Sequence, residues 1–417
     1  MIGPGIITSA ADNDAGGITT YSAAGALFGY NLLWVIVVIT FVLIIVQEMA
    51  ARMGTVTQKG LGELIREQFG VKWTLFALSV LLVANLATTI AEFAGIAAAT
   101  ELLAAASPFN FPFAARYLGV PLAAAGVWFL VVRGNFKTVE RVFLTLAVLY
   151  ATYIISGIMA RPSWSSVIEG ITRPSFAAFD TQYLLFLIAL VGTTITPWMQ
   201  FFLQATVVDK GVDVRHYKYQ KADVIVGSIL TDLVSAFIII AAAATLHHAV
   251  GGPTVVRPEE LDASDLAIAL KPFAGGYATV LFAFGLLGAS LLAAAVLPLS
   301  TAYTFTEAFG FEIGISRKWK EAPAFYGIYT SAIVIGALVA LIPHFNPVLV
   351  MIWSQFVNGL LLPVVLIFML KLINNKAVMG QYTNSKIYNI IVWITAAALI
   401  VFSIIMVLTS IFPTLFQ

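Results

Sequence analysis

Long apolar stretches recur along the whole chain, and they limit what it can fold into more than any other feature of the sequence. A helix needs roughly 20 mostly apolar residues to cross the ~30 Å hydrocarbon core of a bilayer. Stretches of that length follow one another through the 417 residues, and only 10% of the residues are charged. A soluble domain would have about a quarter of its residues charged. The sequence therefore predicts an all-α membrane protein whose solvent is the lipid bilayer.

Hydropathy predicts about eleven transmembrane helices in a single domain that covers residues 1–417. The connections between them are short and have no core pattern, so no linker or separate domain is expected. The stretch 265–310 is too long for one straight crossing, and part of it is expected to lie at the surface or to be tilted. The predicted helices cover residues 3–30, 31–53, 73–105, 112–132, 138–160, 181–208, 222–250, 265–310, 324–343, 346–372 and 387–412.

The positions of Lys and Arg predict how the chain is oriented, because basic residues concentrate in cytoplasmic loops. With a cytoplasmic N-terminus, 17 of the 22 basic residues fall in inside loops. The basic residues that fall outside are Arg116, Arg161, Arg173, Arg257 and Lys271. This asymmetry supports the count of eleven helices. It predicts a multi-pass protein of the cell (plasma or inner) membrane with its N-terminus in the cytoplasm.

Several classes of function are excluded by what the sequence lacks. Cysteine is absent, which rules out disulfides and thiolate metal sites. A net charge of +1 argues against a nucleic-acid partner, which would need a basic face. We find no P-loop, nucleophile elbow or HExxH pair, and the 4 histidines form no metal-binding or catalytic pattern. We therefore expect no enzyme and no cofactor, and no obligate protein partner is evident.

Two aspartates interrupt the first predicted helix. Asp12 and Asp14 lie in the middle of GPGIITSAADNDAGGITTYSAAGA, directly before Gly16 and Gly17. A charge at the bilayer centre costs about 2.5 to 3.5 kcal/mol on insertion scales. The helix is therefore predicted to unwind there, so that carbonyl and carboxylate oxygens line a polar cavity instead of facing lipid. Such a break predicts a site for a hard cation. A purely structural role is the weaker interpretation for Asp14, and a place at the cavity rim stays open for Asp12.

The sixth predicted helix is interrupted at a matching position by GTTITP, residues 192–197. Paired interrupted helices in corresponding positions are typical of inverted-repeat transporters, which bind substrate between the breaks. The two halves share no clear sequence identity, so this prediction depends on position and composition. It divides the chain into a first five-helix repeat (1–160), a second five-helix repeat (181–372) and an additional helix (387–412).

Five segments, taken in order, resemble the NRAMP divalent-metal transporters of the LeuT-like fold. GPG followed by ADNDAGG resembles the opening segment of the family, in which Asp14 matches the aspartate of an Asp-Pro-Gly-Asn motif and Gly17 stands for the asparagine. The other segments are QEMAARMGTVTQKGLGELIRE (47–67), ATTIAEFAG (87–95), SQFVNGLLLP (354–363) and MGQYTNS. The resemblance covers nearly the whole chain. It implies a LeuT-like fold, alternating access and a divalent cation as substrate.

Departures from the family pattern predict a different ion. Thr196, Pro197 and Trp198 stand where the family usually has Met-Pro-His, so a thioether ligand and a histidine linked to proton movement are both lost. An all-oxygen site suits a hard cation, and losing the histidine removes the group best able to titrate near neutral pH. Thr89 stands where the family usually has an aspartate on the proton route, although Glu92 remains.

These departures resemble the NRAMP-related magnesium transporters, a branch described as moving hydrated Mg²⁺, and also Mn²⁺, without proton coupling. Glycine at position 17 enlarges the site, and Mg²⁺ usually keeps several waters while binding one or two carboxylates. The predicted function is transport of Mg²⁺ or Mn²⁺ down its electrochemical gradient. Proton-coupled Mn²⁺ or Fe²⁺ symport and a non-transporting metal sensor remain as alternatives, and amino-acid transport is disfavoured because the two acids would repel a carboxylate.

Carried over by position, the resemblance implies a cation site centred on Asp14. The carbonyls of Ala11 and Thr193 would line it, Thr196 would replace the thioether, and Gln355 would offer an amide oxygen. Helix packing explains a glutamine inside the membrane equally well. Other residues are expected to support the ligands or to line the pathway: Asp12, Asn13, Thr89, Glu92, Trp198 and Asp232.

Overall fold

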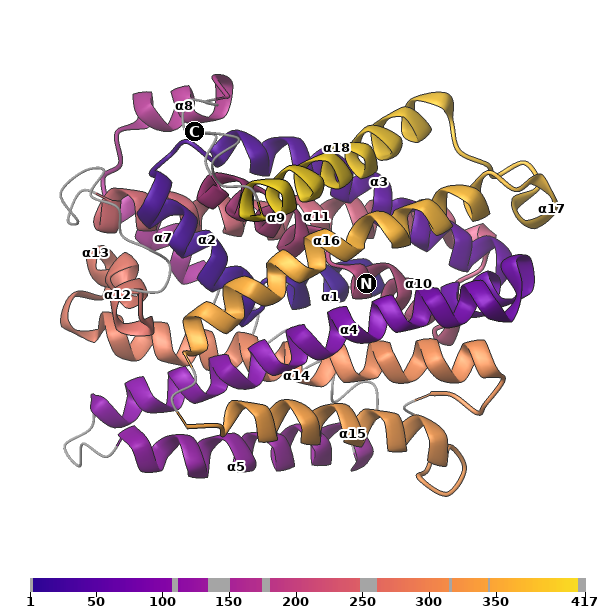
Figure 1. Cartoon of the computed structure of the whole chain (residues 1–417), viewed down its shortest axis with the longest axis horizontal. Coiled ribbons are helices and arrows are strands. Elements are labelled where there is room, and N and C mark those ends of the chain that lie inside the picture. Colours follow the sequence, from indigo (N-terminus) through magenta and orange to yellow (C-terminus); the bar gives the residue numbers. More distant parts are fainter. Residues whose placement is uncertain are drawn as a thin grey trace.

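The computed structural model describes residues 3–106, 112–133, 151–174, 181–247, 261–314, 317–343 and 346–411. Within these residues all regular structure is helical, and nine helices are long and apolar enough to cross a membrane. The long helices run side by side along the long axis of the molecule (Figure 1). Eight of the nine correspond to α3 (Leu33–Thr57), α4 (Leu61–Ala105), α5 (Pro112–Arg133), α11 (Tyr217–Ala242), α14 (Ala278–Phe309), α15 (Pro323–Ala340), α16 (Pro347–Ile373) and α18 (Lys386–Ile411). The ninth is the interrupted stretch Thr181–Asp209.

Both predicted helix breaks are present. The first predicted helix consists of α1 (Pro4–Asp12) and α2 (Ala15–Phe28), and the sixth consists of α9 (Thr181–Thr194) and α10 (Pro197–Asp209). Proline suits the first position of a helix and restricts the residue before it to extended backbone. Thr196 accordingly has φ −64° and ψ 141°, and α10 begins at the next residue. The chain thus stops and restarts a helix at each break because of the residues found there.

Three other predicted ranges differ from the observed helices. The range 265–310 is not one helix: α12 (Ala263–Ala267) and α13 (Lys271–Ala274) precede Gly275, whose φ is 53°, and the long helix α14 begins only at Ala278. The fifth range, 138–160, appears as α7 (Ala151–Met159), because residues 134–150 lie outside the described part. The range that begins at 73 starts earlier, since α4 begins at Leu61 and is interrupted at Gly70, with φ 77°.

Two short helices were not predicted. They are α8 (Trp164–Thr172) and α17 (Lys376–Met379), and both are shorter than a membrane crossing. In Figure 1, α17 lies at one end of the long axis, whereas α8, α12 and α13 lie at the other. We refer to these as the α17 end and the α12 end.

The four half-helices α1, α2, α9 and α10 are largely buried between the longer helices. Helix α4 packs along both α14 and α16, and α11 packs against α1 and α2. Close contacts need glycine: a side chain added at Gly192 of α9 would lie 2.2 Å from the carbonyl oxygen of Gln355 in α16. One added at Gly227 of α11 would lie 3.0 Å from the carbonyl oxygen of Gly5 in α1. Small residues at such crossings let membrane helices approach closely and fix their register.

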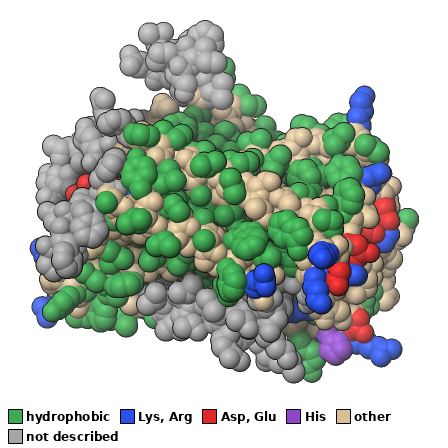
Figure 2. Space-filling view, turned by 90° about the horizontal axis from the view of Figure 1, so that it is seen from below, with side chains coloured by type: hydrophobic (Ala, Val, Ile, Leu, Met, Phe, Trp, Pro, Cys, Tyr) green, Lys and Arg blue, Asp and Glu red, His purple; other side chains and the backbone are tan. Residues whose placement is uncertain are grey.

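The surface has the character of a membrane protein. In the face drawn in Figure 2, hydrophobic side chains cover the middle, and most charged side chains that are visible gather towards the α17 end. Large apolar residues such as Phe41, Leu122 and Ile394 are more than 60% exposed. An apolar surface of this extent would be unfavourable in water but matches lipid tails.

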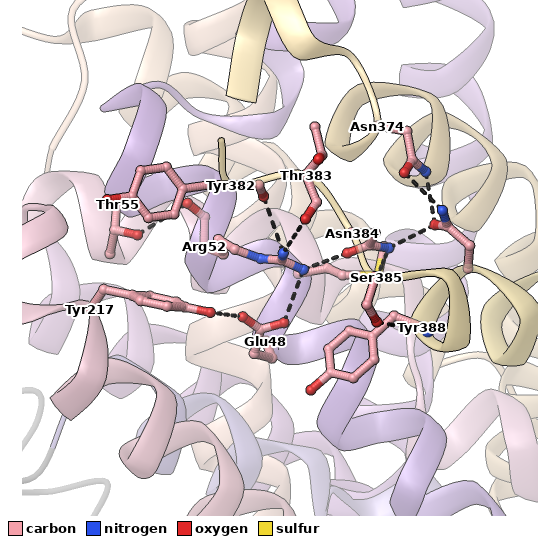
Figure 3. A network of polar contacts seen from close by, with 12 residues as sticks. Glu48, Arg52, Thr55, Tyr217, Asn374, Tyr382, Thr383, Asn384, Ser385 and Tyr388 are labelled. Carbon is pink, nitrogen blue, oxygen red and sulfur yellow. Dashed lines mark hydrogen bonds and ion pairs between the residues drawn. The ribbon is translucent and has the colours of Figure 1, made fainter. Parts of the chain in front are cut away.

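A buried polar network joins three parts of the chain (Figure 3). The guanidinium of Arg52, near the end of α3, lies 3.1 Å from the carboxylate of Glu48 and donates to the carbonyls of Tyr382 at 3.1 Å and Thr383 at 3.2 Å. Tyr217, the first residue of α11, donates its hydroxyl proton to Glu48. Two segments that carry the family resemblance, 47–67 and MGQYTNS, are thereby in direct contact.

Candidate cation site

Asp14 occupies the break between α1 and α2. It is the N-cap of α2, where its Oδ1 accepts a hydrogen bond from the N–H of Gly17 at 2.5 Å. A carboxylate is favoured at this position because it pairs with a free N–H and with the positive end of the helix dipole. The amide nitrogen of Gln355 on α16 also donates to both carboxylate oxygens, each at 3.3 Å. Asp14 is therefore held in one orientation while it stays only 1% exposed.

Three oxygen atoms lie close to the position where a side chain at Gly17 would begin. A side-chain carbon at Gly17 would lie 3.0 Å from Oγ1 of Thr193, 3.1 Å from Oδ1 of Asp14 and 3.2 Å from the carbonyl oxygen of Asp12. Among the described residues, Thr193 Oγ1 is buried without a hydrogen-bond partner. A hydroxyl, a carboxylate and a carbonyl that face one small space are the donors that hard cations prefer.

Each break also frees a backbone carbonyl. The N–H of Ala15, which would bond to the carbonyl of Ala11 in a continuous helix, donates instead to Oε2 of Glu92 at 3.2 Å. The carbonyl of Thr193 would need the N–H of residue 197, which is a proline and has none. Ala11 and Thr193, the two residues whose carbonyls were predicted to line the site, thus both lack the bond of a regular helix.

Asp12 and Asn13, at the end of α1, have polar partners of their own. Thr196 donates its hydroxyl proton to Oδ1 of Asp12 at 3.4 Å, and within the described part of the chain the Oδ2 of Asp12 is buried without a partner. Asn13 is fixed to α11, since it donates to Thr231 at 3.5 Å and accepts from Ser235 at 3.1 Å. The structure therefore brings Asp12 and Thr196 together, whereas Asn13 attaches the end of α1 to α11.

Helix α4 contributes Glu92 but not Thr89. The carboxylate of Glu92 lies beside that of Asp14, and its Oε2 accepts the hydrogen bond from the N–H of Ala15. Thr89 donates to the carbonyl of Asn85 in its own helix at 2.7 Å, and its methyl group faces α15. Of the two positions on α4 that the sequence singled out, only Glu92 reaches the break.

The amide of Gln355 faces Asp14 with its nitrogen rather than its oxygen. Its oxygen accepts a hydrogen bond from Nδ2 of Asn358 at 2.9 Å. In this arrangement Gln355 supports Asp14 and does not present the oxygen expected of a ligand. Asn358 was missed by the sequence analysis, although its position one helical turn after Gln355 could have indicated a contact.

Trp198 and Asp232 were also expected to support the site. Trp198 is fully buried, packs edge-on against Phe202 with ring centroids 6.0 Å apart, and accepts a hydrogen bond at its carbonyl from Ser300 of α14. Asp232 of α11 is buried beside Thr40 of α3, and its carboxylate lies close enough to that of Asp12 for the two to repel each other. Asp232 therefore belongs to the surroundings of the break through Asp12, whereas Trp198 packs against α10 and α14.

The site is closed and consists of oxygen donors. Within the described residues no group of three or more His, Cys, Asp and Glu side chains is arranged to hold a metal ion. A cation here would use one or two carboxylates together with hydroxyl and carbonyl oxygens, which are the donors that hard cations prefer. The side chains around the break are at most 2% exposed, namely Asp12, Asn13, Asp14, Thr193, Thr196 and Gln355.

Known proteins resemble the chain over nearly its whole length. A family model described as natural resistance-associated macrophage protein-like (Nramp) matches residues 5–409. The divalent metal cation transporter MntH 1 of Pseudomonas aeruginosa is 30% identical, over 97% of this chain and 89% of that protein. The divalent metal cation transporter MntH of Bacillus subtilis is 25% identical, over 98% of this chain and 92% of that protein.

Solved structures share the fold. A crystal structure of the Eremococcus coleocola manganese transporter has a TM-score of 0.75 and 24% identity, and the match covers 97% of this chain and 85% of that chain. The structure of MhsT in complex with L-phenylalanine has a TM-score of 0.61 and 18% identity, over 97% of this chain and 98% of the other. The predicted LeuT-like fold with a broken first and sixth helix is confirmed, whereas the boundaries of the two five-helix repeats stay a prediction.

Proposed function

This chain belongs to the Nramp family, and from that premise we propose that it carries divalent cations across the cell membrane, with hydrated Mg²⁺ as the main substrate and Mn²⁺ as a second. The related proteins are named as divalent metal cation transporters and a manganese transporter, which supports the general class. The choice of Mg²⁺ depends on one observation. The space at Gly17 is bordered by oxygen atoms of Asp14, Thr193 and Asp12.

The donor set supports Mg²⁺ over softer ions. Thr196 offers a hydroxyl at the position where the family resemblance implies a methionine thioether. A sulfur ligand would favour softer transition metals, so its replacement by oxygen favours a hard cation. Mg²⁺ loses water reluctantly and binds through few carboxylates, so one firmly held carboxylate with a hydroxyl and a carbonyl oxygen nearby suits it. Mn²⁺ accepts similar oxygen donors and is proposed as a second substrate.

Transport is proposed to be uncoupled from protons. Trp198 replaces the histidine expected from the family resemblance, and Thr89 replaces an aspartate and has its hydroxyl bonded within α4. Uptake needs no proton, because a membrane potential contributes about 2.3 kcal/mol per charge for each 100 mV, or about 4.6 kcal/mol for a divalent ion. With a cytoplasmic N-terminus, the α17 end faces the cytoplasm, and alternating access would open the closed site to each side in turn.

Parallel dyes test this proposal. Liposomes that contain the protein are loaded with a Mg²⁺ dye or a pH dye and are given an inside-negative potential. We expect Mg²⁺ entry without acidification. Mn²⁺ entry accompanied by acidification, with no Mg²⁺ signal, would return the protein to proton-coupled symport. Binding without any flux would identify a sensor.

A further inference from the structure

A chain of hydrogen bonds connects the backbone of α4 to Asp14. Thr88 donates its hydroxyl proton to the carbonyl of Ala84 at 3.0 Å and accepts from Nδ2 of Asn358 at 2.9 Å. The same amide nitrogen donates to Oε1 of Gln355 at 2.9 Å, and Nε2 of Gln355 donates to both oxygens of Asp14 at 3.3 Å. These side chains are at most 1% exposed.

The groups at the two ends of this series of hydrogen bonds can only accept. The carbonyl of Ala84 is fixed in the helix, and Asp14 accepts when it is ionised. Because Thr88 uses its proton on Ala84, its oxygen accepts from Asn358, and Asn358 must then donate to Gln355 as well. Thr88 could instead donate its hydroxyl proton to Oδ1 of Asn358, but that contact is longer, at 3.3 Å, than its bond to the carbonyl of Ala84. The shorter bonds direct the nitrogen of Gln355 towards Asp14.

The amide of Gln355 lies directly against the start of α2. A side-chain carbon at Gly16 would lie 2.0 Å from Nε2 of Gln355, so a glycine is needed there. An amide in this position can present its oxygen to Asp14 instead of its nitrogen by turning over. Turning would present the oxygen to a cation beside Asp14, but it would oppose the amide nitrogens of Gln355 and Asn358.

We propose that Asn358, anchored by Thr88, is a specificity-determining positioning residue that keeps the oxygen of Gln355 away from the transported cation. A dehydrated cation would gain from an additional oxygen ligand, whereas a cation that keeps its water does not need one. The Thr88–Asn358 pair thus favours hydrated Mg²⁺ over dehydrated Mn²⁺. This inference depends on the proposed function, because it explains a preference between two cations of the same site.

Asn358→Asp tests the inference with little change in shape. A carboxylate at this position only accepts, so both Thr88 and Gln355 would donate to it, and the oxygen of Gln355 would turn towards the cation. We expect the ratio of the KM for Mn²⁺ to the KM for Mg²⁺ in proteoliposomes to fall by about tenfold, the change that one added ligand bond of ordinary strength would produce. Thr88→Val should shift the ratio in the same direction by a smaller factor.

The double variant Asn358→Asp/Gln355→Leu separates the inference from the effect of an added charge. Because Gln355→Leu has no amide to turn, the double variant should have the same ratio of KM values for Mn²⁺ and Mg²⁺ as the single variant Gln355→Leu. Three results would each overturn the inference. The double variant could show the same shift as Asn358→Asp, Asn358→Asp could change the KM values for both ions equally, or the ratio could stay unchanged in folded Asn358→Asp and Thr88→Val. If the wild-type protein carried Mn²⁺ but no Mg²⁺, the proposed function would fail, and an unchanged KM for Mn²⁺ in Asn358→Asp would overturn the positioning role separately.

Discussion

Glu92 of α4 accepts a hydrogen bond from the backbone N–H of Ala15 at 3.2 Å, at the first residue of the second half of a broken helix. This bond takes the N–H away from the carbonyl of Ala11 and so stabilises the break. It also brings a second carboxylate beside that of Asp14 in a fully buried site. Among the described residues no basic side chain interacts with either acid, and two neighbouring carboxylates that are not compensated by a protein charge attract a cation strongly.

Glu92→Gln should separate these two roles. The glutamine still offers an oxygen to Ala15 but has no charge, so we expect the protein to fold and its KM for Mg²⁺ to rise. Glu92→Ala should also lower stability by about 1 to 3 kcal/mol, because the buried N–H of Ala15 loses its partner. Flux assays and thermal unfolding in detergent measure the two effects. Equal KM values for wild type and Glu92→Gln would show that the charge plays no part in binding.

Thr196→Met restores the thioether that the family resemblance leads one to expect. Sulfur favours softer cations, so we expect the apparent affinities for Mn²⁺ and Cd²⁺ to rise by about tenfold relative to that for Mg²⁺. Thr196→Val is the matched control, since it removes the hydroxyl from Asp12 without adding sulfur. If both variants had the same ion preference, position 196 would not contact the ion.

Gly17→Ala should crowd the oxygen atoms beside Asp14. The added carbon would lie 3.0 to 3.2 Å from three oxygen atoms, which is tighter than an ordinary contact, so these oxygens would have to shift and would leave less room for an ion with its water. We expect slower Mg²⁺ flux and a smaller effect on Mn²⁺, which needs fewer waters. Gly126→Ala is the control, because none of the described atoms lies within 4 Å of the carbon that it adds. Equal slowing of both ions would argue against a hydrated substrate.

Arg52→Ala should destabilise the α17 end. It leaves Glu48, which is 1% exposed, with a buried charge that has lost its cation, a change that typically costs about 3 to 5 kcal/mol. The double variant Arg52→Met/Glu48→Gln removes both charges and should recover part of the loss. Thermal unfolding in detergent measures both variants. A single variant as stable as the wild type would mean that this pair contributes nothing.

The helix breaks could be predicted from the sequence because their causes are local. Asp12 and Asp14 are too costly for a continuous membrane helix, and Pro197 cannot continue one. The donor types around Asp14 followed from a family resemblance that the comparisons confirm. The sequence also indicated that residues 265–310 exceed one crossing, but the turn at Gly275 depends on backbone geometry that composition does not reveal.

The orientation of Gln355 could not be predicted in the same way. It depends on Asn358 and Thr88, which act through hydrogen bonds between α16 and α4. The same applies to Asp223, whose carboxylate accepts from the N–H groups of Gly3 and Gly5 and so holds the start of α1. Thr88 lies 270 residues before Asn358, and Asp223 lies 218 residues or more after its two glycine partners, so only tertiary packing brings these groups together.

The role of Asp14 is tested most directly by comparing Mg²⁺ uptake by the wild type and Asp14→Asn in liposomes at a fixed inside-negative potential. The asparagine keeps the shape of the N-cap but removes the charge, and the unfolding temperature checks that the variant is folded. We expect saturable Mg²⁺ uptake by the wild type and its loss, by at least about tenfold, in the folded variant. Undiminished uptake by Asp14→Asn would contradict this role, because the cation would then cross the membrane without the one carboxylate around which the site is built.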